Sequence, residues 1–225
     1  MLDKLNRLTI VTGHYGSGKT NLSVNLALDI KAKGNDVVLV DLDIVNPYFR
    51  SADFVELMQK HDIQTINPIY ANTNLDLPAL SPQISAALDT DKHIIIDVGG
   101  DDAGAAALGR YAQQIKALDG HNMLYVVNCF RYLTRDAVDA VKILREIEAV
   151  SRLEATYIVN NSNLAGATSL ADVSDSMAYA KKVCDIANLP LLFTSAKTDI
   201  GIELLRQKAE KIYPVEIYVK KLWEK

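Results

Sequence analysis

The sequence predicts an α/β fold, a three-layer, doubly wound arrangement with helices on both faces of a mainly parallel sheet of about six to seven strands. Short apolar runs, which are typical of strands buried on both faces, alternate along the chain with longer segments of helical periodicity. No linker-like, repetitive or low-complexity stretch interrupts this alternation. We therefore expect a single domain over residues 1–225.

The first strand and the first helix enclose a glycine-rich turn. Residues 8–11 are a short apolar run, and residues 21–31 repeat apolar residues at helical spacing. Between them, residues 13–20 read Gly-His-Tyr-Gly-Ser-Gly-Lys-Thr and match the phosphate-loop pattern G-x-x-x-x-G-K-[ST] at every fixed position. The pattern binds phosphate in this order of strand, loop and helix, so a glycine-rich turn without a ligand is the weaker interpretation.

This turn should bind a polyphosphate. Its backbone N–H groups and the positive end of the helix dipole favour an anion, and glycines let the backbone approach phosphate closely. Lys19 can reach the β- and γ-phosphates, and Thr20 can offer its hydroxyl to Mg²⁺. The predicted nucleotide-binding residues in this part of the chain are Gly13, Tyr15, Gly16, Ser17, Gly18, Lys19, Thr20 and Asn21.

A second predicted strand leads to two aspartates. Residues 37–40 form an apolar run that ends in Asp41-Leu42-Asp43, followed by a segment, 44–50, that is too irregular for a helix. Residues 61–82 read as a loop-rich excursion, and Ser81-Pro82 predicts the start of a helix through residue 88. Ligands collect at the carboxyl ends of strands in open α/β sheets, so these aspartates indicate a site beside the phosphate loop.

A third predicted strand also ends in a carboxylate. Residues 93–96 are apolar, Asp97 follows them, and Gly100 lies in the glycine-containing segment beyond. This is the Walker B arrangement, in which the carboxylate holds Mg²⁺ directly or through its water shell, while a glycine lets a backbone N–H approach the γ-phosphate. The structural alternative for Asp97 is a cap on a helix from about Ala103.

Three further pairs of strand and helix complete the predicted sheet. The first is residues 123–127 with a helix capped by Thr134, which carries Val138, Val141, Leu144 and Ile147 on one face. The second is residues 157–159 with a helix from about Ala171 to Ala187, and the third is residues 191–193 with a helix from Ile200 to about Ile212. The polar clusters all follow strands. We therefore expect the loops 13–20, 41–50, 97–104, 160–163 and 194–198 on one rim of the sheet.

These motifs, in this order and over most of the chain, resemble the MinD/ParA-type group within the SIMIBI class of P-loop NTPases. The resemblance implies that Lys19 and Asp43 are catalytic, with Asp43 positioning the attacking water. It implies that Thr20, Asp43 and Asp97 serve a bound Mg²⁺, and that Asn160 meets the nucleotide base. It also allows a nucleotide-dependent homodimer.

The phosphate loop departs from that group at two positions. Members with the deviant motif carry a signature lysine directly after the first glycine, where this chain has His14, and Tyr15 stands where the group prefers glycine. Histidine is shorter than lysine and is usually neutral at pH 7. We therefore expect slow hydrolysis that is accelerated by a partner or by another cation such as Arg50.

The choice of base rests on two segments. Ser195, Ala196 and Lys197 resemble the S-A-K loop with which GTPases contact guanine. The segment Asn160-Asn161-Ser162-Asn163, however, lacks the Lys and the Asp of N-K-x-D, and without that Asp the donors of guanine have no carboxylate acceptor. The sequence therefore favours ATP over GTP.

The leading interpretation is a cytoplasmic, Mg²⁺-dependent ATP-binding protein and slow ATPase that acts as a switch for an unidentified protein partner. The alternatives are a small-molecule kinase or ligase of the same fold and a GTPase-type switch. A net charge of −4 and the lack of a long apolar run give no strong sign of nucleic-acid or membrane binding. The tail 215–223 could anchor weakly to a membrane, but a docked strand or helix is the favoured interpretation.

Overall fold

The computed structural model describes residues 2–43, 52–67 and 82–219. Eight strands in these ranges form one sheet, with the order β3-β2-β4-β1-β5-β6-β7-β8, and all neighbouring strands are parallel. The strands are β1 (Leu8–Thr12), β2 (Val37–Leu42), β3 (Gln64–Ile66), β4 (His93–Val98), β5 (His121–Val127), β6 (Tyr157–Asn160), β7 (Leu191–Lys197) and β8 (Ile212–Val215).

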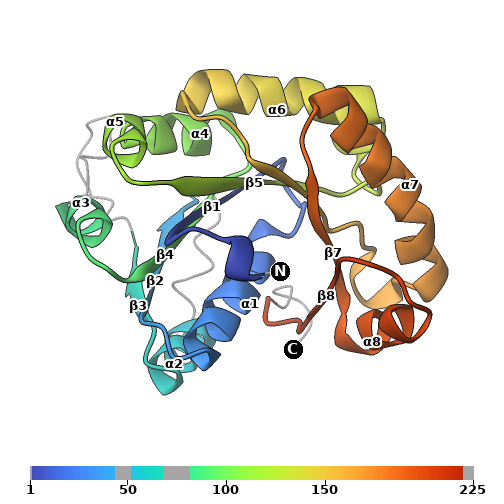
Figure 1. Ribbon diagram of the computed structural model, residues 1–225, viewed down its shortest axis with the longest axis horizontal. Helices are drawn as coiled ribbons and strands as arrows, with labels where there is room; N and C mark the ends of the chain where they lie inside the picture. Colours follow the sequence, from blue (N-terminus) through green and yellow to red (C-terminus); the bar gives the residue numbers. More distant parts are fainter. Residues whose placement is uncertain (1, 44–51, 68–81, 220–225) are drawn as a thin grey trace.

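Helices cover both faces of the sheet, which confirms the predicted three-layer, doubly wound α/β fold (Figure 1). The helices are α1 (Lys19–Ala32), α2 (Ala52–Lys60), α3 (Pro82–Leu88), α4 (Asp102–Gly109), α5 (Ala112–Lys116), α6 (Ala137–Ser151), α7 (Leu170–Ala187) and α8 (Thr198–Arg206). Short 3-10 turns occur at Leu2–Lys4, Tyr132–Thr134 and Ala165–Ala167. None of the helices in the described ranges is long and apolar enough to cross a membrane.

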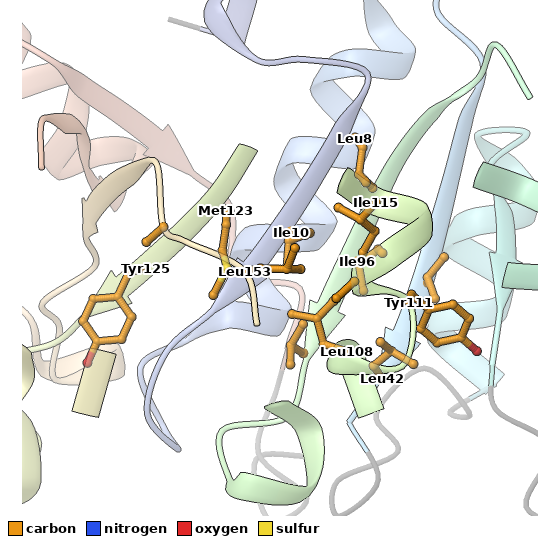
Figure 2. Packing of buried hydrophobic residues seen from close by; sticks show 14 of the residues in the cluster. Leu8, Ile10, Leu42, Ile96, Leu108, Tyr111, Ile115, Met123, Tyr125 and Leu153 are labelled. Atoms are coloured by element: carbon orange, nitrogen blue, oxygen red, sulfur yellow. The ribbon is translucent and has the colours of Figure 1, made fainter. Parts of the chain in front are cut away.

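The two faces of the sheet have separate cores because successive strand side chains point to opposite sides. Leu8 and Ile10 of β1 pack with Ile115 of α5 in the core under α3 to α7, and Figure 2 shows these side chains converging. Val11 of β1 points the other way and packs in the core under α1 and α2. The central strand β1 is buried along its whole length, so the loop that follows it is held rigidly.

The edge strands β3 and β8 were not expected from the sequence, and the sheet is therefore larger than predicted. Residues 64–66 fall in the predicted loop-rich segment, and their pattern is exposed, half-buried and buried rather than continuously apolar. The prediction of a last helix reaching about Ile212 is wrong, because α8 ends at Arg206 and Ile212 begins β8. Ile212 lies eight residues beyond Leu204, a spacing that a helix and a new strand can both produce.

The start of α6 also differs from the prediction. Asp136, not Thr134, is its N-cap and accepts a hydrogen bond from Val138 N at 2.8 Å. The 3-10 turn at Tyr132–Thr134 comes before it. Val138 is 62% exposed, because a spacing of three residues drifts by about 60° per step in a helix of 3.6 residues per turn and takes Val138 away from the buried face of Leu144. The predictions for 44–50, for Ser81 and for the end of the tail lie outside the described residues.

Candidate functional site

The turn between β1 and α1 has the backbone of a tight loop that only glycine permits. Gly13 has a φ of 146°, and Gly18 has a φ of 86°. A Cβ on Gly13 would collide with the Val126 carbonyl oxygen of β5, and a Cβ on Gly18 would collide with the Asn161 side-chain amide. The fixed glycines of the motif are thus required by the chain around them.

Polar groups inside this turn are left for a ligand. The N-cap of α1 is Gly18, which has no side chain that could accept from the first N–H groups of the helix. Ser17 is buried, and its Oγ has no hydrogen-bond partner among the residues that the structure describes. Because buried polar groups are nearly always paired, these two features fit an anion seated at the positive end of the helix dipole.

Lys19 lies at the centre of the turn as a buried cation that is 6% exposed. Its Nζ donates to the His14 carbonyl oxygen at 3.2 Å. Burial lowers the pKa of Lys19, and the negative charges of Asp97, Asp43 and Asp101 act in the opposite direction. The ammonium group therefore sits among carboxylates at the loop, where phosphate oxygens would offer it stronger acceptors than a carbonyl.

Asp97, at the carboxyl end of β4, accepts hydrogen bonds from two hydroxyls of α1. Thr20 Oγ1 donates to its Oδ2 at 2.7 Å, and Ser23 Oγ lies 3.1 Å from its Oδ1. Burial raises the pKa of Asp97 to about 6. A hydroxyl beside a carboxylate at the mouth of the phosphate loop is a donor set of the kind that Mg²⁺ prefers, so these residues fit the cation that the motif implies.

The structural alternative for Asp97 is wrong. The cap of α4 is Asp101, whose Oδ1 accepts a hydrogen bond from Gly104 N at 2.9 Å. Asp97 is instead enclosed by the sheet and α1, because β4 lies next to β1. Its carboxylate therefore lies on the side of the sheet covered by α1, where it contacts Thr20 and Ser23.

The end of β2 brings the other two aspartates to the same place. Asp41 is buried and lies beside Asp97 in the parallel register of β2 and β4. Its Oδ1 accepts a hydrogen bond from Asp43 N at 2.8 Å, which holds the backbone at the strand end. Asp43 Oδ1 would be 3.4 Å from a Cβ added to Gly99, so Asp43 borders the glycines after β4.

Gly100 contacts the phosphate loop directly. A Cβ added there would be 2.5 Å from Tyr15 N and 2.8 Å from Lys19 Nζ, so no other residue fits without a shift. Tyr15 is 61% exposed, and its side chain therefore lies away from this contact. The structure thus brings the phosphate loop, Asp43, Asp97 and Gly100 together, with Lys19 near the carboxylates of Asp43 and Asp97.

Asn160, predicted to meet the base, is fully buried at the end of β6. Its Nδ2 donates to Ser176 Oγ at 2.9 Å, and its Oδ1 accepts from Ser162 Oγ at 2.7 Å. Both ends of the amide are therefore occupied inside the protein. In this conformation Asn160 supports the loop that follows it.

The predicted S-A-K segment is strand rather than loop. β7 continues through Lys197 because it pairs with β8, the strand that the sequence analysis does not predict. Ser195 and Ala196 are consequently buried, and Ser195 Oγ donates to Asn161 Oδ1 at 2.6 Å. Lys197 is exposed at the rim and forms an ion pair with Asp199 at 2.9 Å.

Asn21 uses its side chain to hold the tail. Its Nδ2 donates to the Glu216 carbonyl oxygen at 2.9 Å, and its Oδ1 accepts from Tyr218 N at 2.8 Å. Asn25, one turn further along α1, binds the backbone N–H and C=O of Glu216 at 2.9 Å each. The chain after β8 is therefore docked on α1 through residue 219, and the side chain of Asn21 is engaged with that segment.

Sequence reasoning misses three residues of the site. Ser23 carries a weak signal, because it lies one helical turn after Lys19 and Thr20 on the buried side of α1. Asn161, which donates to the Ser17 carbonyl oxygen at 2.6 Å, directly follows Asn160, the residue predicted to meet the base. Arg131, which donates from Nε to the Gly16 carbonyl oxygen at 2.8 Å, has no signal in the sequence.

Comparison with solved structures supports the fold. The cell division protein FtsY from Thermotoga maritima is 19% identical, with a TM-score of 0.59 over 86% of this chain and 63% of that one. A nucleotide-binding protein in complex with ADP from Archaeoglobus fulgidus is 14% identical, with a TM-score of 0.53 over 90% of this chain and 86% of that one. The signal recognition particle 54 kDa protein from Aeropyrum pernix, in complex with GDP, is 16% identical, with a TM-score of 0.52 over 83% and 40%.

The chain spans 63%, 58% and 61% of the length of three FtsY structures, and at these identities the likeness concerns the fold. No curated protein sequence matches the chain. A model of the CobQ/CobB/MinD/ParA nucleotide-binding domain, however, matches residues 8–213, from the first strand to the last. The chain therefore belongs to the CobQ/CobB/MinD/ParA nucleotide-binding domain family, and its fold is that of a SIMIBI-class P-loop NTPase.

Proposed function

We propose that this protein is a Mg²⁺-dependent ATP-binding switch with slow intrinsic ATPase activity, whose affinity for a protein partner depends on the bound nucleotide. The observation that carries the proposal is the phosphate loop, where Lys19 is buried at the start of α1 and Ser17 Oγ has no hydrogen-bond partner among the described residues. Such groups are stable together when a polyphosphate supplies the missing acceptors and negative charge.

Each residue of the phosphate side has a role in this proposal. Lys19 and the loop N–H groups bind the β- and γ-phosphates and stabilise the charge that develops on the transferred phosphoryl group. Thr20, Asp97 and Asp43 would hold Mg²⁺, which when bound neutralises phosphate charge. Asp43, beside Gly99, orients the attacking water, and the N–H of Gly100 approaches the γ-phosphate.

Slow hydrolysis follows from the residue that replaces the signature lysine. Burial, reinforced by the nearby charge of Lys19, lowers the pKa of His14, so the imidazole is neutral at pH 7. A neutral side chain cannot supply the added cation that accelerates phosphoryl transfer by roughly 10³–10⁵. We propose that a partner, or a nucleotide-bridged second copy of the chain, supplies the acceleration.

ATP is the proposed nucleotide. The loop after β6 offers Asn161, Ser162 and Asn163 but no carboxylate to accept the donors of guanine. A GTPase-type switch is the second candidate, favoured by the likeness to a signal recognition particle protein solved with GDP. The Archaeoglobus fulgidus protein of similar fold was solved with ADP, so the fold by itself is compatible with either base.

Two measurements test the proposal on the purified protein. Calorimetry with MgATPγS and MgGTPγS should show binding, tighter for ATP, and binding should weaken when EDTA removes Mg²⁺. Single-turnover reactions with γ-labelled ATP should release inorganic phosphate slowly and as the only labelled product. A protein that binds neither nucleotide contradicts the proposal, and transfer of label to an added small molecule favours a kinase or ligase instead.

A further inference from the structure

We infer that Arg131 is a positioning residue for the phosphate loop. From the connection between β5 and α6, Arg131 holds the outer side of the loop and thereby sets the affinity of the loop for polyphosphate. The inference rests on the proposed function, because it concerns the same site. It assigns a role in nucleotide binding to the segment between β5 and α6.

Arg131 lies against the middle of the loop. Its Nε donates to the Gly16 carbonyl oxygen at 2.8 Å. A Cβ added to Gly16 would be 3.2 Å from Nε and 3.3 Å from Cζ, so the guanidinium group packs on the glycine itself. Gly16 has a φ of 75°, which an L side chain rarely adopts, and the arginine occupies the space that a side chain would need.

Asn161 holds the next peptide group in the same way. Its Nδ2 donates to the Ser17 carbonyl oxygen at 2.6 Å, from the connection after β6. Two consecutive carbonyls are thus fixed from two neighbouring strands. In a planar trans peptide group, the C=O and the following N–H point in opposite directions. Holding the Gly16 and Ser17 carbonyls outward therefore turns the N–H groups of Ser17 and Gly18 inward.

The inward side is where the donors converge. Ser17 N and Lys19 Nζ both donate to the His14 carbonyl oxygen, at 3.2 Å each, so the two donors point to the same side of the loop. An anion bound on this side would take over donors that a single carbonyl oxygen now accepts. The outer contacts of Arg131 and Asn161 are therefore what orients the loop for its ligand.

The backbone around Arg131 is itself held in place. Arg131 N lies 3.2 Å from the Asn128 carbonyl oxygen, and its own carbonyl accepts from Thr134 N at 3.1 Å. Asn128 is fully buried, and its Oδ1 accepts from Phe130 N at 3.0 Å. The guanidinium thus reaches the loop from a rigid turn, and, unlike Asn161, it adds a positive charge there.

The test compares polyphosphate with nucleotide. Calorimetry with tripolyphosphate and with MgATPγS would be run on wild type, Arg131→Met, Arg131→Lys and the control Arg135→Met. Arg135 is exposed in the same segment, and no hydrogen bond or ion pair of its side chain is found among the described residues. Arg131→Met keeps much of the stem but removes the donor and the charge, so it should weaken both ligands by the same factor, about three- to thirtyfold.

The remaining outcomes decide between a positioning role and a structural one. Arg131→Lys should recover part of the affinity, because Nζ can donate to a carbonyl without the fixed guanidinium geometry, and Arg135→Met should bind like wild type. Equal affinity of Arg131→Met and wild type for tripolyphosphate overturns the inference and leaves the proposed function standing. Wild-type protein that binds neither ATP nor GTP overturns the proposed function, and the inference with it. Should Arg131→Met fail to fold, Arg131→Lys with wild-type affinity for both ligands would contradict the fixed-geometry role.

Discussion

At the phosphate loop, Ser17 Oγ is buried without a hydrogen-bond partner among the described residues, and Lys19 Nζ donates to a backbone carbonyl at 3.2 Å. On the part of the rim where the base is expected, Asn160 is equally buried, yet both ends of its amide are bonded, to Ser176 and Ser162. A buried polar group without a partner is destabilising by about 1–3 kcal/mol. The phosphate loop therefore retains a buried polar group without a hydrogen-bond partner among the described residues, whereas the amide of Asn160 is fully hydrogen-bonded within the protein.

This difference indicates where a bound ligand would add the most hydrogen bonds. On the phosphate side a polyphosphate would supply partners that the protein lacks, so large effects on binding are expected from single substitutions there. Where the base is expected, the buried side chains maintain the loop, so we expect only less buried residues, such as the half-buried Asn163, to discriminate between bases. The variants below probe this contrast.

Lys19→Ala should have the largest effect. It removes the buried cation aimed at the β- and γ-phosphates, so MgATPγS affinity measured by calorimetry should fall by at least about a hundredfold. Lys33→Ala is the matched control, since Lys33 lies on the surface and pairs with Asp3 at 2.6 Å. Wild-type affinity in Lys19→Ala would exclude this loop as the phosphate site.

Asp43→Ala should affect hydrolysis more than binding. If Asp43 orients the water, single-turnover hydrolysis should slow by about a hundredfold or more, with nucleotide affinity nearly retained.

His14→Ala should change the hydrolysis rate less than about threefold, because the imidazole of His14 is neutral at pH 7. His14→Lys would show whether the missing cation can be restored. If the hydrolysis rate of His14→Ala falls as far as that of Asp43→Ala, His14 takes a direct part in hydrolysis, contrary to the prediction.

Asp97→Asn should separate stability from metal dependence. The pKa of Asp97 is raised to about 6 in the folded protein from its ordinary 3.8, so the folded state binds this proton more tightly than the unfolded state. The wild type then loses stability as the pH rises from about 3.8 to about 6, and at pH 7.5 it is about 3 kcal/mol less stable than it would be with Asp97 protonated.

Chemical denaturation of the ligand-free protein should therefore show Asp97→Asn to be more stable than wild type at pH 7.5, by about 1–3 kcal/mol, with a smaller difference at pH 5. The same variant should show a weaker dependence of nucleotide binding on Mg²⁺, because the amide has lost the charge. Asp91→Asn, at an exposed position, is the control. An unchanged Mg²⁺ dependence would contradict the metal role of Asp97.

The base side should show smaller effects. ATP should bind more tightly than GTP by at least about tenfold, as expected when guanine donors lack an acceptor. Asn163→Asp places a carboxylate beside Asn161 and should shift the preference toward GTP in competition assays. Asn188→Asp, after α7, is the control. An unmoved preference would mean that this loop does not meet the base.

Asn21→Ala should have the smallest effect on ligand binding. Its side chain holds the backbone of Glu216 and Tyr218, so its loss should lower the free energy of unfolding by about 1 kcal/mol. MgATPγS affinity should change less than about threefold, since the side chain of Asn21 is engaged with the chain after β8. A loss of affinity as large as in Lys19→Ala would show that the side chain itself binds the nucleotide.

Sequence reasoning works best where the signal is local. Residues 13–20 are contiguous, and the glycines that the pattern demands are those whose Cβ atoms would collide with β5 or with the loop after β6. Each of the six inner strands contains a short, mostly apolar run, because a parallel strand buried on both faces has no solvent-exposed side. The edge strand β3, half exposed, carries no such run, and β8 contains Pro214, which suits an edge but weakens a strand signal.

The sequence by itself thus determined the phosphate loop, the carboxylates after the inner strands and the α/β class, since each depends on neighbours along the chain. Only the tertiary structure decided which side chains complete the loop. Arg131 and Asn161 reach Gly16 and Ser17 across 115 and 144 positions of sequence. Those contacts exist because β5 lies beside β1 and β6 lies beside β5, and strand order is set by the packing of the whole sheet.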